Sequence, residues 1–208
     1  MREIVRALIW LGVITGAVGA LLYLFVVDTW RVPGDPALVT AAAPQLAAAD
    51  LLLVRRKGPP KHGELARCLS PADGSYVIGR VYGEPGEHVE VKDDVVTTNG
   101  QRPAAASRAA CPMVTLPHPV TQNLVKLSCG VADTGAFSFQ YLTGERPSAA
   151  RSATDVGPGK LYLVSDNRHL HQDSRDFGVV DADTCQHVVY RLWGEKYADD
   201  NRRFTMLW

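Results

Sequence analysis

The sequence has no excess of either charge. Lysine and arginine total 22, aspartate and glutamate total 22, and the formal net charge at pH 7 is +0. Proteins that bind nucleic acid carry a clustered basic excess, so this balance argues against a nucleic-acid partner. Disorder is excluded as well, because 46% of the 208 residues are hydrophobic. A chain of this length and composition can form one domain with a real core, or two small ones.

Beyond residue 30 the sequence lacks any long stretch with apolar residues at helical spacing, and it has no internal repeat. Short apolar and β-branched runs recur instead between turn residues, which is typical of an all-β domain. The runs are Leu51–Val54, Tyr76–Tyr82, His88–Val91, Val95–Thr98, Leu124–Leu127, Phe137–Tyr141, Leu161–Val164 and Val188–Trp193. Asn99 and Gly100 predict a hairpin turn, because both residues tolerate positive φ.

Three segments are poor in strand signals. The alanine-rich tract Ala37–Ala49 favours helix by propensity, but Pro36 and Pro44 interrupt it. Proline, alanine, serine and arginine dominate Gln101–Ala110 and Gly144–Gly159. We expect these last two segments to be surface loops.

The chain has a single long uncharged run, over residues 7–27. At about 1.5 Å rise per residue, a helix of that length spans the roughly 30 Å hydrocarbon core of a bilayer. A cleavable signal peptide would have a shorter apolar core followed by a small-x-small site, whereas this run leads into Asp28, Thr29 and Trp30. The sequence therefore predicts an uncleaved transmembrane helix.

The flanks of this run predict its orientation. Arg2 and Arg6 precede it, and the large domain follows it. The positive-inside tendency places residues 1–6 in the cytoplasm and residues 28–208 on the other side of the inner (cytoplasmic) membrane. We expect a single-pass membrane protein with a periplasmic, or otherwise extracytoplasmic, C-terminal domain.

Cysteine is scarce, and its spacing is not that of a metal site. The four cysteines include no CxxC pair, so we expect no zinc and no other metal. An even number of cysteines outside the cytoplasm predicts disulfides, and four cysteines allow three connectivities. Cys111 and Cys129 flank a proline-rich stretch and are the favoured pair, with Cys68 and Cys185 either joined or free.

The most informative segment, Ser165–Gly178, follows the predicted strand Leu161–Val164. It contains three acids, two arginines and two histidines. Because unpaired buried charge is costly, such a segment is either a solvated loop or a tightly paired network. Dense charge is usually solvated, so composition alone favours the loop.

Seven residues of this segment keep the type and spacing of a known motif, namely Asp166, Asn167, Arg168, Asp173, Ser174, Arg175 and Gly178. They resemble the GDNRxxSxDSRxxG box of the type I signal peptidase family, also called leader peptidases. Gly79–Glu87 is similar to that family's KRVxGxPGD segment, and Val95–Gly100 resembles the strand ending in Asn-Gly that follows it. Residues 101–159 match nothing in the family and are expected to be a variable insert.

The resemblance implies a mainly β, signal-peptidase-like antiparallel domain behind one N-terminal transmembrane helix. It also implies membrane-anchored serine peptidases that remove signal peptides from exported proteins with a Ser nucleophile and a Lys general base, and no cofactor. A serine hydroxyl is a weak nucleophile until a base takes its proton. Lysine serves as that base only where an apolar site lowers its pKa toward neutrality.

All four positions of this chemistry are replaced. Counting three residues back from Pro44, in the manner of the family's SxMxPT segment, places the nucleophile at Ala41, and the lysine position is Gly79. The family's oxyanion-hole serine falls on Val39, and the serine that supports the lysine falls on His171. We therefore expect the peptidase fold without its catalytic dyad.

The remaining motif residues are expected to form a structural network, in which Asp173 pairs with Arg80 or Arg175 and keeps two strands in register. Its members are Arg80, Asp166, Asn167, Arg168, Asp173, Ser174 and Arg175.

Two other arrangements of the same segment stay open. In one, Thr40, the only nearby hydroxyl, is activated by His171, which Asp173 orients. In the other, His169 and His171 bind a metal with Asp166 and Asp173, although such pairs on loops are often simply hydrogen-bonded.

Three functions are compatible with the sequence. The favoured one is a pseudoenzyme of the export and envelope machinery that keeps an extended-peptide groove, in which a substrate adds as a β-strand. It would hold signal peptides or exported proteins, or associate with an active signal peptidase. The alternatives are an active type I signal peptidase and a structural subunit of an envelope complex.

The C-terminal segment Arg202–Trp208 is apolar with a basic lead. It either dips into the membrane interface or completes an edge of the core.

Overall fold

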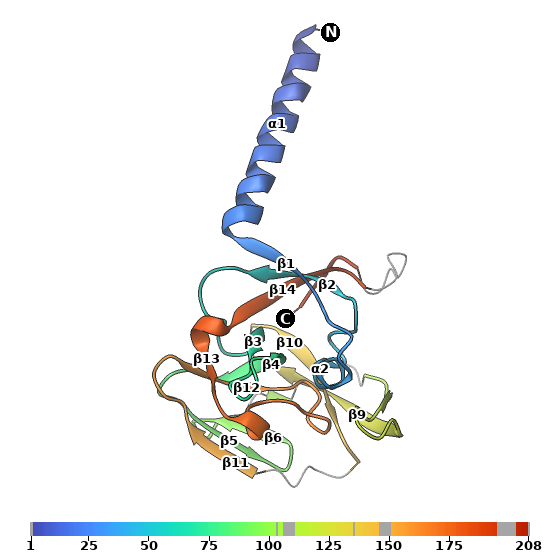
Figure 1. The fold of residues 1–208 in the computed structure, drawn as a ribbon, viewed down its shortest axis with the longest axis vertical. Helices are drawn as coiled ribbons and strands as arrows, with labels where there is room; N and C mark the ends of the chain where they lie inside the picture. The colour runs from blue at the N-terminus through green and yellow to red at the C-terminus, as the bar shows by residue number, and fades with distance from the viewer. Residues whose placement is uncertain are drawn as a thin grey trace.

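The structure is a computed structural model that describes residues 2–102, 104–105, 111–134, 136–145, 151–194 and 203–207. One long helix projects from a domain built of antiparallel β-sheets (Figure 1). The mainly β architecture behind an N-terminal apolar helix, expected from the sequence, is confirmed.

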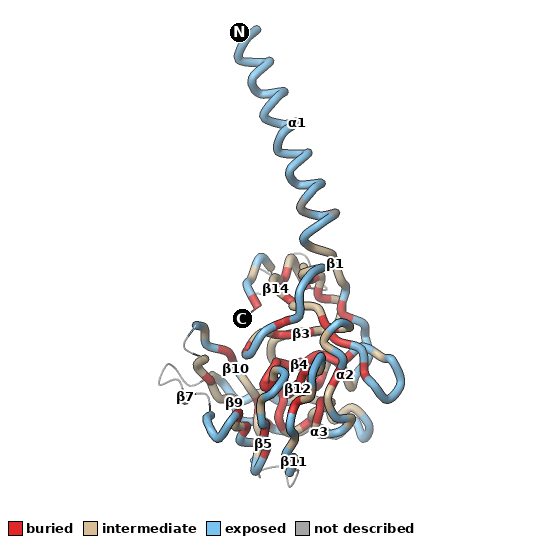
Figure 2. Tube along the Cα trace, turned by 90° about the vertical axis from the view of Figure 1, so that its left-hand side faces the viewer, coloured by how far each residue is buried: buried red, intermediate tan, exposed pale blue. Residues whose placement is uncertain are grey.

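Helix α1 (Arg2–Phe25) stands away from the domain, and its described side chains are exposed (Figure 2). Its segment Arg2–Leu21 is long and apolar enough to cross a membrane. The helix is shifted from the expected residues 7–27, because Val27 already begins strand β1 (Val27–Arg31). These residues exchange hydrogen bonds with a neighbouring strand, which a longer helix would leave unpaired.

The largest sheet has eight strands in the order β1-β2-β14-β3-β4-β12-β13, with β15 beside β14. After β1, its strands are β2 (Leu51–Arg55), β3 (Leu65–Leu69), β4 (Tyr76–Gly83), β12 (Lys160–Val164), β13 (Val180–Asp181), β14 (Gln186–Trp193) and β15 (Thr205–Met206). Strand β4 lies between β3 and β12. The KRVxGxPGD-like strand and the acidic segment after β12 therefore lie side by side.

Two smaller antiparallel sheets complete the domain. One contains β5 (His88–Lys92), β6 (Val95–Thr98) and β11 (Arg151–Asp155), and the other contains β7 (Ala104–Ala105), β8 (Val114–Pro117), β9 (Leu124–Asp133) and β10 (Ser138–Thr143). The turn predicted at Asn99 and Gly100 is present, with both residues at positive φ. A similar pair at positive φ, Asp93 and Asp94, joins β5 to β6.

Part of the segment expected to be loop is a strand. Gly144–Gly159 lacks the usual strand composition, yet Arg151–Asp155 pairs along the whole of β5. The pairing satisfies backbone groups at the edge of β5, a tertiary effect that overrides local preference. Residues 101–159, expected to be a variable insert, contain the five strands β7 to β11. Residues 106–110 and 146–150 lie outside the described part.

The alanine-rich tract forms helix α2 (Pro36–Ala42). The carboxylate of Asp35 accepts a hydrogen bond from the N–H of Ala37 (3.0 Å), and Pro36 occupies the first turn, where an N–H has no helical partner. The helix ends before Pro44, because proline disfavours helical geometry in the residue that precedes it. A short helix α3 (Ser174–Phe177) and a single 3-10 turn η1 (Ala182–Thr184) follow β12.

A large cluster of core side chains lies between α2 and the inner face of the strands next to α1. It is formed by Val32, Leu38, Ala42, Leu46, Leu52, Val54, Leu65, Ile78, Val188 and Leu207. The C-terminal segment completes this edge, since β15 pairs with β14 and Leu207 is buried. Arg202 and Trp208 lie outside the described residues.

Both disulfides are formed. Cys111 joins Cys129, the pair favoured by the sequence, and Cys68 joins Cys185. The second bond connects β3 to the segment before β14, across 117 residues of sequence.

Candidate functional site

Helix α2 carries two of the positions singled out from the sequence, Val39 and Ala41. Ala41 lies in the last turn and is only 1% exposed, whereas Val39 is partly exposed. The cap at Asp35 and the stop before Pro44 fix where this turn lies. The side chain of Ala41 is a methyl group, which neither donates nor accepts a hydrogen bond.

Asn167 ties α2 to the acidic segment after β12. Its backbone N–H donates to the carbonyl of Ala41 (3.1 Å), and its side-chain amide donates to the carbonyl of Thr40 (3.0 Å). Its side-chain oxygen accepts from the N–H groups of His169 (3.2 Å) and Leu170 (2.9 Å). Because Asn167 is fully buried, losing these partners would strand polar groups away from water. The bonds therefore hold Ala41 at a defined place against this segment.

Gly79 lies on β4, opposite Ala66 of β3, and is buried. A Cβ added there would lie 3.1 Å from the Cβ of Leu163 and 3.3 Å from the carbonyl of Val164. Non-bonded carbon atoms prefer a separation of about 3.5–4.0 Å. Strand β12 therefore crowds the position that the Cβ of any side chain at residue 79 would occupy.

Arg80 and Asp166 form a fully buried ion pair. Two guanidinium nitrogens of Arg80 donate to the two carboxylate oxygens of Asp166, at 2.9 and 2.8 Å, and a third donates to the carbonyl of Gly63 at 2.8 Å. The ring of Phe139 lies against the guanidinium, 3.9 Å from its central carbon. Bidentate geometry and an aromatic face suit arginine better than lysine. The pair joins β4 to the segment after β12.

Arg168 points into the domain and contacts aromatic rings. It donates to the hydroxyl of Tyr82 (2.7 Å) and lies over the rings of Tyr82 and Tyr141. Burial by itself lowers the pKa of Arg168, but attraction to Tyr82 and Asp166 outweighs it, and the pKa is raised above its ordinary value. Arg168 is thus a permanent buried cation.

Asp173 pairs with Arg175, while Arg80 pairs with Asp166, so the structure selects one of the two partners left open by the sequence. Arg175 donates to both oxygens of Asp173 (2.9 and 2.7 Å), and the backbone N–H of Ser165 donates to one of them (2.7 Å). Arg80 does not pair with Asp173 because its three guanidinium nitrogens already donate to Asp166 and to the carbonyl of Gly63.

The neighbours of Asp173 complete a tight turn. The hydroxyl of Ser174 accepts from the N–H of Leu163 (2.9 Å), and Asp176 accepts from the N–H of Asp173 (3.0 Å). Asp176 also contacts a ring nitrogen of His171 at 2.8 Å. The considered arrangement in which Asp173 orients His171 is therefore wrong, because Asp176 holds the ring and Arg175 holds Asp173.

Three potential metal ligands lie within 4.8 Å of one another: His171, Asp173 and Asp176. Hydrogen bonds within the protein account for this grouping, since Arg175 neutralises Asp173 and Asp176 contacts His171. The set considered from the sequence is not assembled in the described part of the chain, because this group includes neither His169 nor Asp166.

Asp173 gives the fold a pH dependence. Burial by itself would raise the pKa of Asp173, but hydrogen bonds and the charge of Arg175, with the N–H of Ser165, lower it below the usual value. A carboxylate of this kind adds stability that is fully present above the pKa of the unfolded chain, about 3.9, and is lost as pH falls through the lower folded pKa. We expect Asp173→Asn to make the fall in unfolding free energy below about pH 4 shallower in urea titrations. Asp183→Asn, at an exposed position, should leave that fall unchanged, and equal slopes for all three proteins would contradict the assignment.

The structure brings most of the motif residues into one buried network between β4, α2 and α3. Tyr82 and Phe139 also belong to it, and the sequence reasoning missed both. Tyr82 lies two residues after Arg80 in the KRVxGxPGD-like segment, and this proximity to Arg80 was the available signal for it. Phe139 gave none, because β10 reaches Arg80 only through the tertiary fold.

Comparison with known proteins places the sequence in a family. The sequence family described as "Signal peptidase, peptidase S26" matches residues 2–193. Signal peptidase I V of Bacillus subtilis is 33% identical over 108 residues, which are 52% of this chain and 52% of that protein. Signal peptidase IB of Staphylococcus aureus is 26% identical over 170 residues, 81% of this chain and 79% of that protein. A solved signal peptidase I of Enterococcus faecalis aligns with TM-score 0.37 and 22% identity, over 64% of this chain and 97% of that one.

The structure therefore combines an N-terminal apolar helix with an antiparallel β-domain that holds a paired acidic box. The chain belongs to the type I signal peptidase family, whose sequence pattern extends from the helix to the end of β14. The match to the Bacillus relative spans about half of that protein's length.

Proposed function

We propose that this chain is a signal-peptidase-like protein without peptidase activity, which binds exported peptides or acts as a scaffold in the membrane. The proposal rests on the side chains at two positions. The positions assigned to the nucleophile and the general base are Ala41 and Gly79, a methyl group and a bare α-carbon. Hydrolysis by this family's route requires a hydroxyl and an amine at these positions.

Two features of the structure support the assignment of these positions. The backbone hydrogen bond from Asn167 attaches Ala41 to the acidic segment Ser165–Gly178. The alanine-rich tract, which aligns loosely with the family pattern, is thereby fixed next to the motif residues. The close approach of β12 to Gly79 fits a strand that has no lysine to accommodate. The route through Thr40 and His171 has no such support, because among the described residues no hydrogen bond joins Thr40 to His171.

The proposal includes the membrane topology. Residues 1–6 would lie in the cytoplasm, α1 would cross the inner membrane, and residues 28–208 would face the oxidising side. Arg2 and Arg6 at the start of α1 support this orientation. The two disulfides support it independently, since such bonds persist outside the cytoplasm.

A cavity beside α2 supports retained peptide binding. Its volume is about 350 Å³, and its walls come from α2, the residues after it, and the β8 segment. Val39 and Thr40 line one side, and Val114 and Leu116 line the other. An apolar recess next to the former reaction centre suits a side chain of a bound peptide.

Incubation with a preprotein tests the missing activity. We expect the purified full-length chain to leave the preprotein intact under conditions in which an active type I signal peptidase cleaves it. Specific cleavage beside a small-x-small site would contradict the proposal. Cleavage by the double variant Ala41→Ser/Gly79→Lys, and by neither single variant, would support the assigned register. Gly79→Ala serves as its steric control, because it adds only the Cβ that crowds β12.

Photocrosslinking separates a peptide-binding protein from a purely structural subunit. A photoreactive residue placed at Val39, which is partly exposed beside Ala41, should crosslink to a signal peptide. The same residue at Lys92, at the far end of the domain, should not. Equal labelling from both positions, or labelling from neither, would favour the structural subunit.

A further inference from the structure

The cavity of about 350 Å³ beside α2 is bounded on its other side by the hairpin of β8 and β9. Val39 lines it from α2, and Val114 and Leu116 line it from β8. Of the described residues around it, only Thr40 and Gln122 are polar, and none is charged. A group held here is therefore uncharged and mainly apolar, because a charge would leave water without gaining a partner.

The size of the cavity favours large side chains. A methyl group, roughly as large as a water molecule of about 30 Å³, fills about a tenth of it. An apolar cavity of roughly 150 Å³ already holds a benzene ring. A side chain between leucine and phenylalanine in size therefore fits between the two walls, whereas the methyl group of alanine leaves most of the space unfilled.

The wall formed by the hairpin is ordered before any ligand binds. Strand β8 pairs with β9 over its whole length, and the Cys111–Cys129 disulfide ties the chain just before β8 to β9. At the tip, the backbone N–H groups of Val120 and Thr121 donate to Nδ1 of His118, at 3.2 and 3.3 Å. Binding therefore requires little further ordering of this wall.

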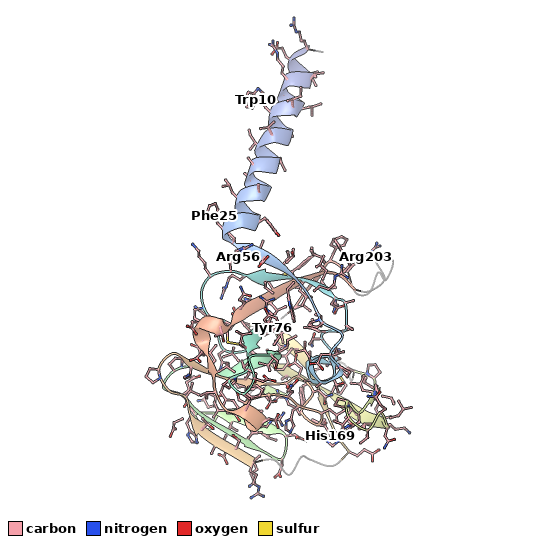
Figure 3. All side chains as sticks on the ribbon, viewed as in Figure 1. Trp10, Phe25, Arg56, Tyr76, His169 and Arg203 are labelled. Carbon is pink, nitrogen blue, oxygen red and sulfur yellow. A yellow bond between two sulfur atoms is a disulfide. The ribbon has the colours of Figure 1, made fainter. Side chains whose placement is uncertain are left out.

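The cavity lies away from the membrane helix. Its two β8 side chains pack against a core cluster that contains Leu170. Figure 3 shows His169, the neighbour of Leu170, in the part of the domain far from Phe25 at the end of α1. Figures 1 and 2 both show β1 and β14 nearer to α1 than α2 and β9 are. A polypeptide in water can therefore reach the cavity without entering the bilayer that α1 would cross.

Strand β8 has an edge to which a further strand can bind. Within the described part of the chain β8 pairs with β9 alone, so the backbone groups along its other edge, the β8 edge, have no strand partner. Proline in a strand, here Pro117, is typical of such an edge. Extended peptides bind to exposed sheet edges through main-chain hydrogen bonds, and pockets for alternate side chains supply the specificity.

The cavity lies on the face to which such a peptide would direct its side chains. Directly opposed residues of paired strands share a face of the sheet. Peptide residues opposite Val114 and Leu116 would therefore point to the face on which these two side chains line the cavity. The peptide residue between them would point to the other face, as the exposed Thr115 does.

We propose that an extended polypeptide adds as a strand to the β8 edge and inserts one large apolar side chain, between leucine and phenylalanine in size, into the cavity beside α2. The inference rests on the peptide binding proposed above and specifies which peptides are bound. The β8 edge holds the backbone of any sequence, and the cavity distinguishes a bulky residue from the small residues of a small-x-small site. Recognition by this route uses neither Ala41 nor Gly79.

Binding of labelled peptides to the full-length chain in detergent tests the proposal. The probes are fluorescein-labelled nonapeptides of serine and threonine with one central guest residue, which is alanine, glutamine, leucine or phenylalanine. Fluorescence anisotropy measures their dissociation constants. We expect the leucine and phenylalanine peptides to bind at least about tenfold more tightly than the alanine peptide, because their side chains leave water on entering the cavity. Glutamine, which is similar in size to leucine but polar, should bind no better than alanine.

Two tryptophan substitutions on β8 test whether the cavity causes this preference. Val114→Trp fills the cavity and should reduce the affinity for the phenylalanine peptide to that for the alanine peptide. Thr115→Trp, the matched control on the opposite face of the same strand, should keep the tenfold preference. Circular dichroism checks that both variants are folded, and the peptide series on the unsubstituted chain tests the preference without them. Equal loss in both variants would contradict binding in this cavity.

N-methylated peptides test the strand pairing. Successive N–H groups of a strand point to opposite edges, so only one of two adjacent N–H groups can reach β8. We expect N-methylation at one of two adjacent residues to weaken binding by about tenfold or more, and at the other to have little effect. Equal effects at both residues would rule out strand addition.

A fluorescein-labelled signal peptide of an exported protein separates failure of this inference from failure of the proposed function. If the signal peptide binds while no guest peptide does, or if all four guest peptides bind equally, the preference for a bulky side chain is wrong and the proposed peptide binding stands. If neither the signal peptide nor any guest peptide binds, both proposals are overturned.

Discussion

Arg80→Met is expected to destabilise the folded domain by about 3–5 kcal/mol, because it leaves the carboxylate of Asp166 buried without a counter-charge. The substitution also removes the donor to the carbonyl of Gly63. Equilibrium unfolding in urea, on the full chain in detergent, measures the loss. Arg151→Met, at an exposed position of β11, is the control and should change the unfolding free energy by less than about 0.5 kcal/mol.

The double variant Arg80→Met/Asp166→Leu separates the two causes of this loss. Replacing both members of a buried ion pair by apolar side chains is often close to neutral. We therefore expect the double variant to be more stable than Arg80→Met alone. If it is equally unstable, the lost bond to Gly63, rather than the stranded carboxylate, dominates the cost.

Removal of the Cys68–Cys185 disulfide is expected to cost about 4–5 kcal/mol, and removal of Cys111–Cys129 only about 3 kcal/mol. The first bond closes a sequence separation of 117 residues and the second one of 18. A longer closed loop restricts the unfolded chain more, so its opening releases more conformational entropy on unfolding. Paired alanine substitutions, compared by urea unfolding under non-reducing conditions, measure both losses.

The order of the two disulfide variants is the discriminating result. Equal losses, or a greater loss for the Cys111–Cys129 pair, would show that local contacts rather than loop closure govern these bonds. Cys68 is fully buried and Cys129 is partly exposed, so the packing lost with Cys68 acts in the same direction as the entropy.

Much of the strand content could be predicted from local patterns. Val95–Thr98 has the bounds of β6, and Tyr76–Tyr82 falls short of β4 by a single residue. Both runs are rich in β-branched or aromatic residues between turn signals. Strand β3 was missed because its sequence, LARCL, lacks alternation. Most of it is buried on both faces, with Leu65 in one core cluster and Ala66 and Cys68 in another. Strand β11 was missed because only its pairing with β5 makes it a strand.

The candidate site was predictable in its membership but not in its pairing. Spacing along the chain identified the acidic box, and the high cost of unpaired buried charge required each member to have a partner. Which arginine meets which aspartate depends on how β4, β12 and α3 lie relative to one another. The choice of Asp166 for Arg80 and of Arg175 for Asp173 was therefore settled only by the fold.

By itself the sequence determined that this protein has a long apolar helix, a β-rich domain, the motif pattern of its family, and alanine and glycine where that pattern carries serine and lysine. These properties depend on residue identity and on spacing along the chain. The tertiary structure alone decided the partners in the ion-pair network and the close approach of β12 to Gly79. Those properties arise from contacts between segments far apart in the sequence, and local patterns carry no record of which segments will meet.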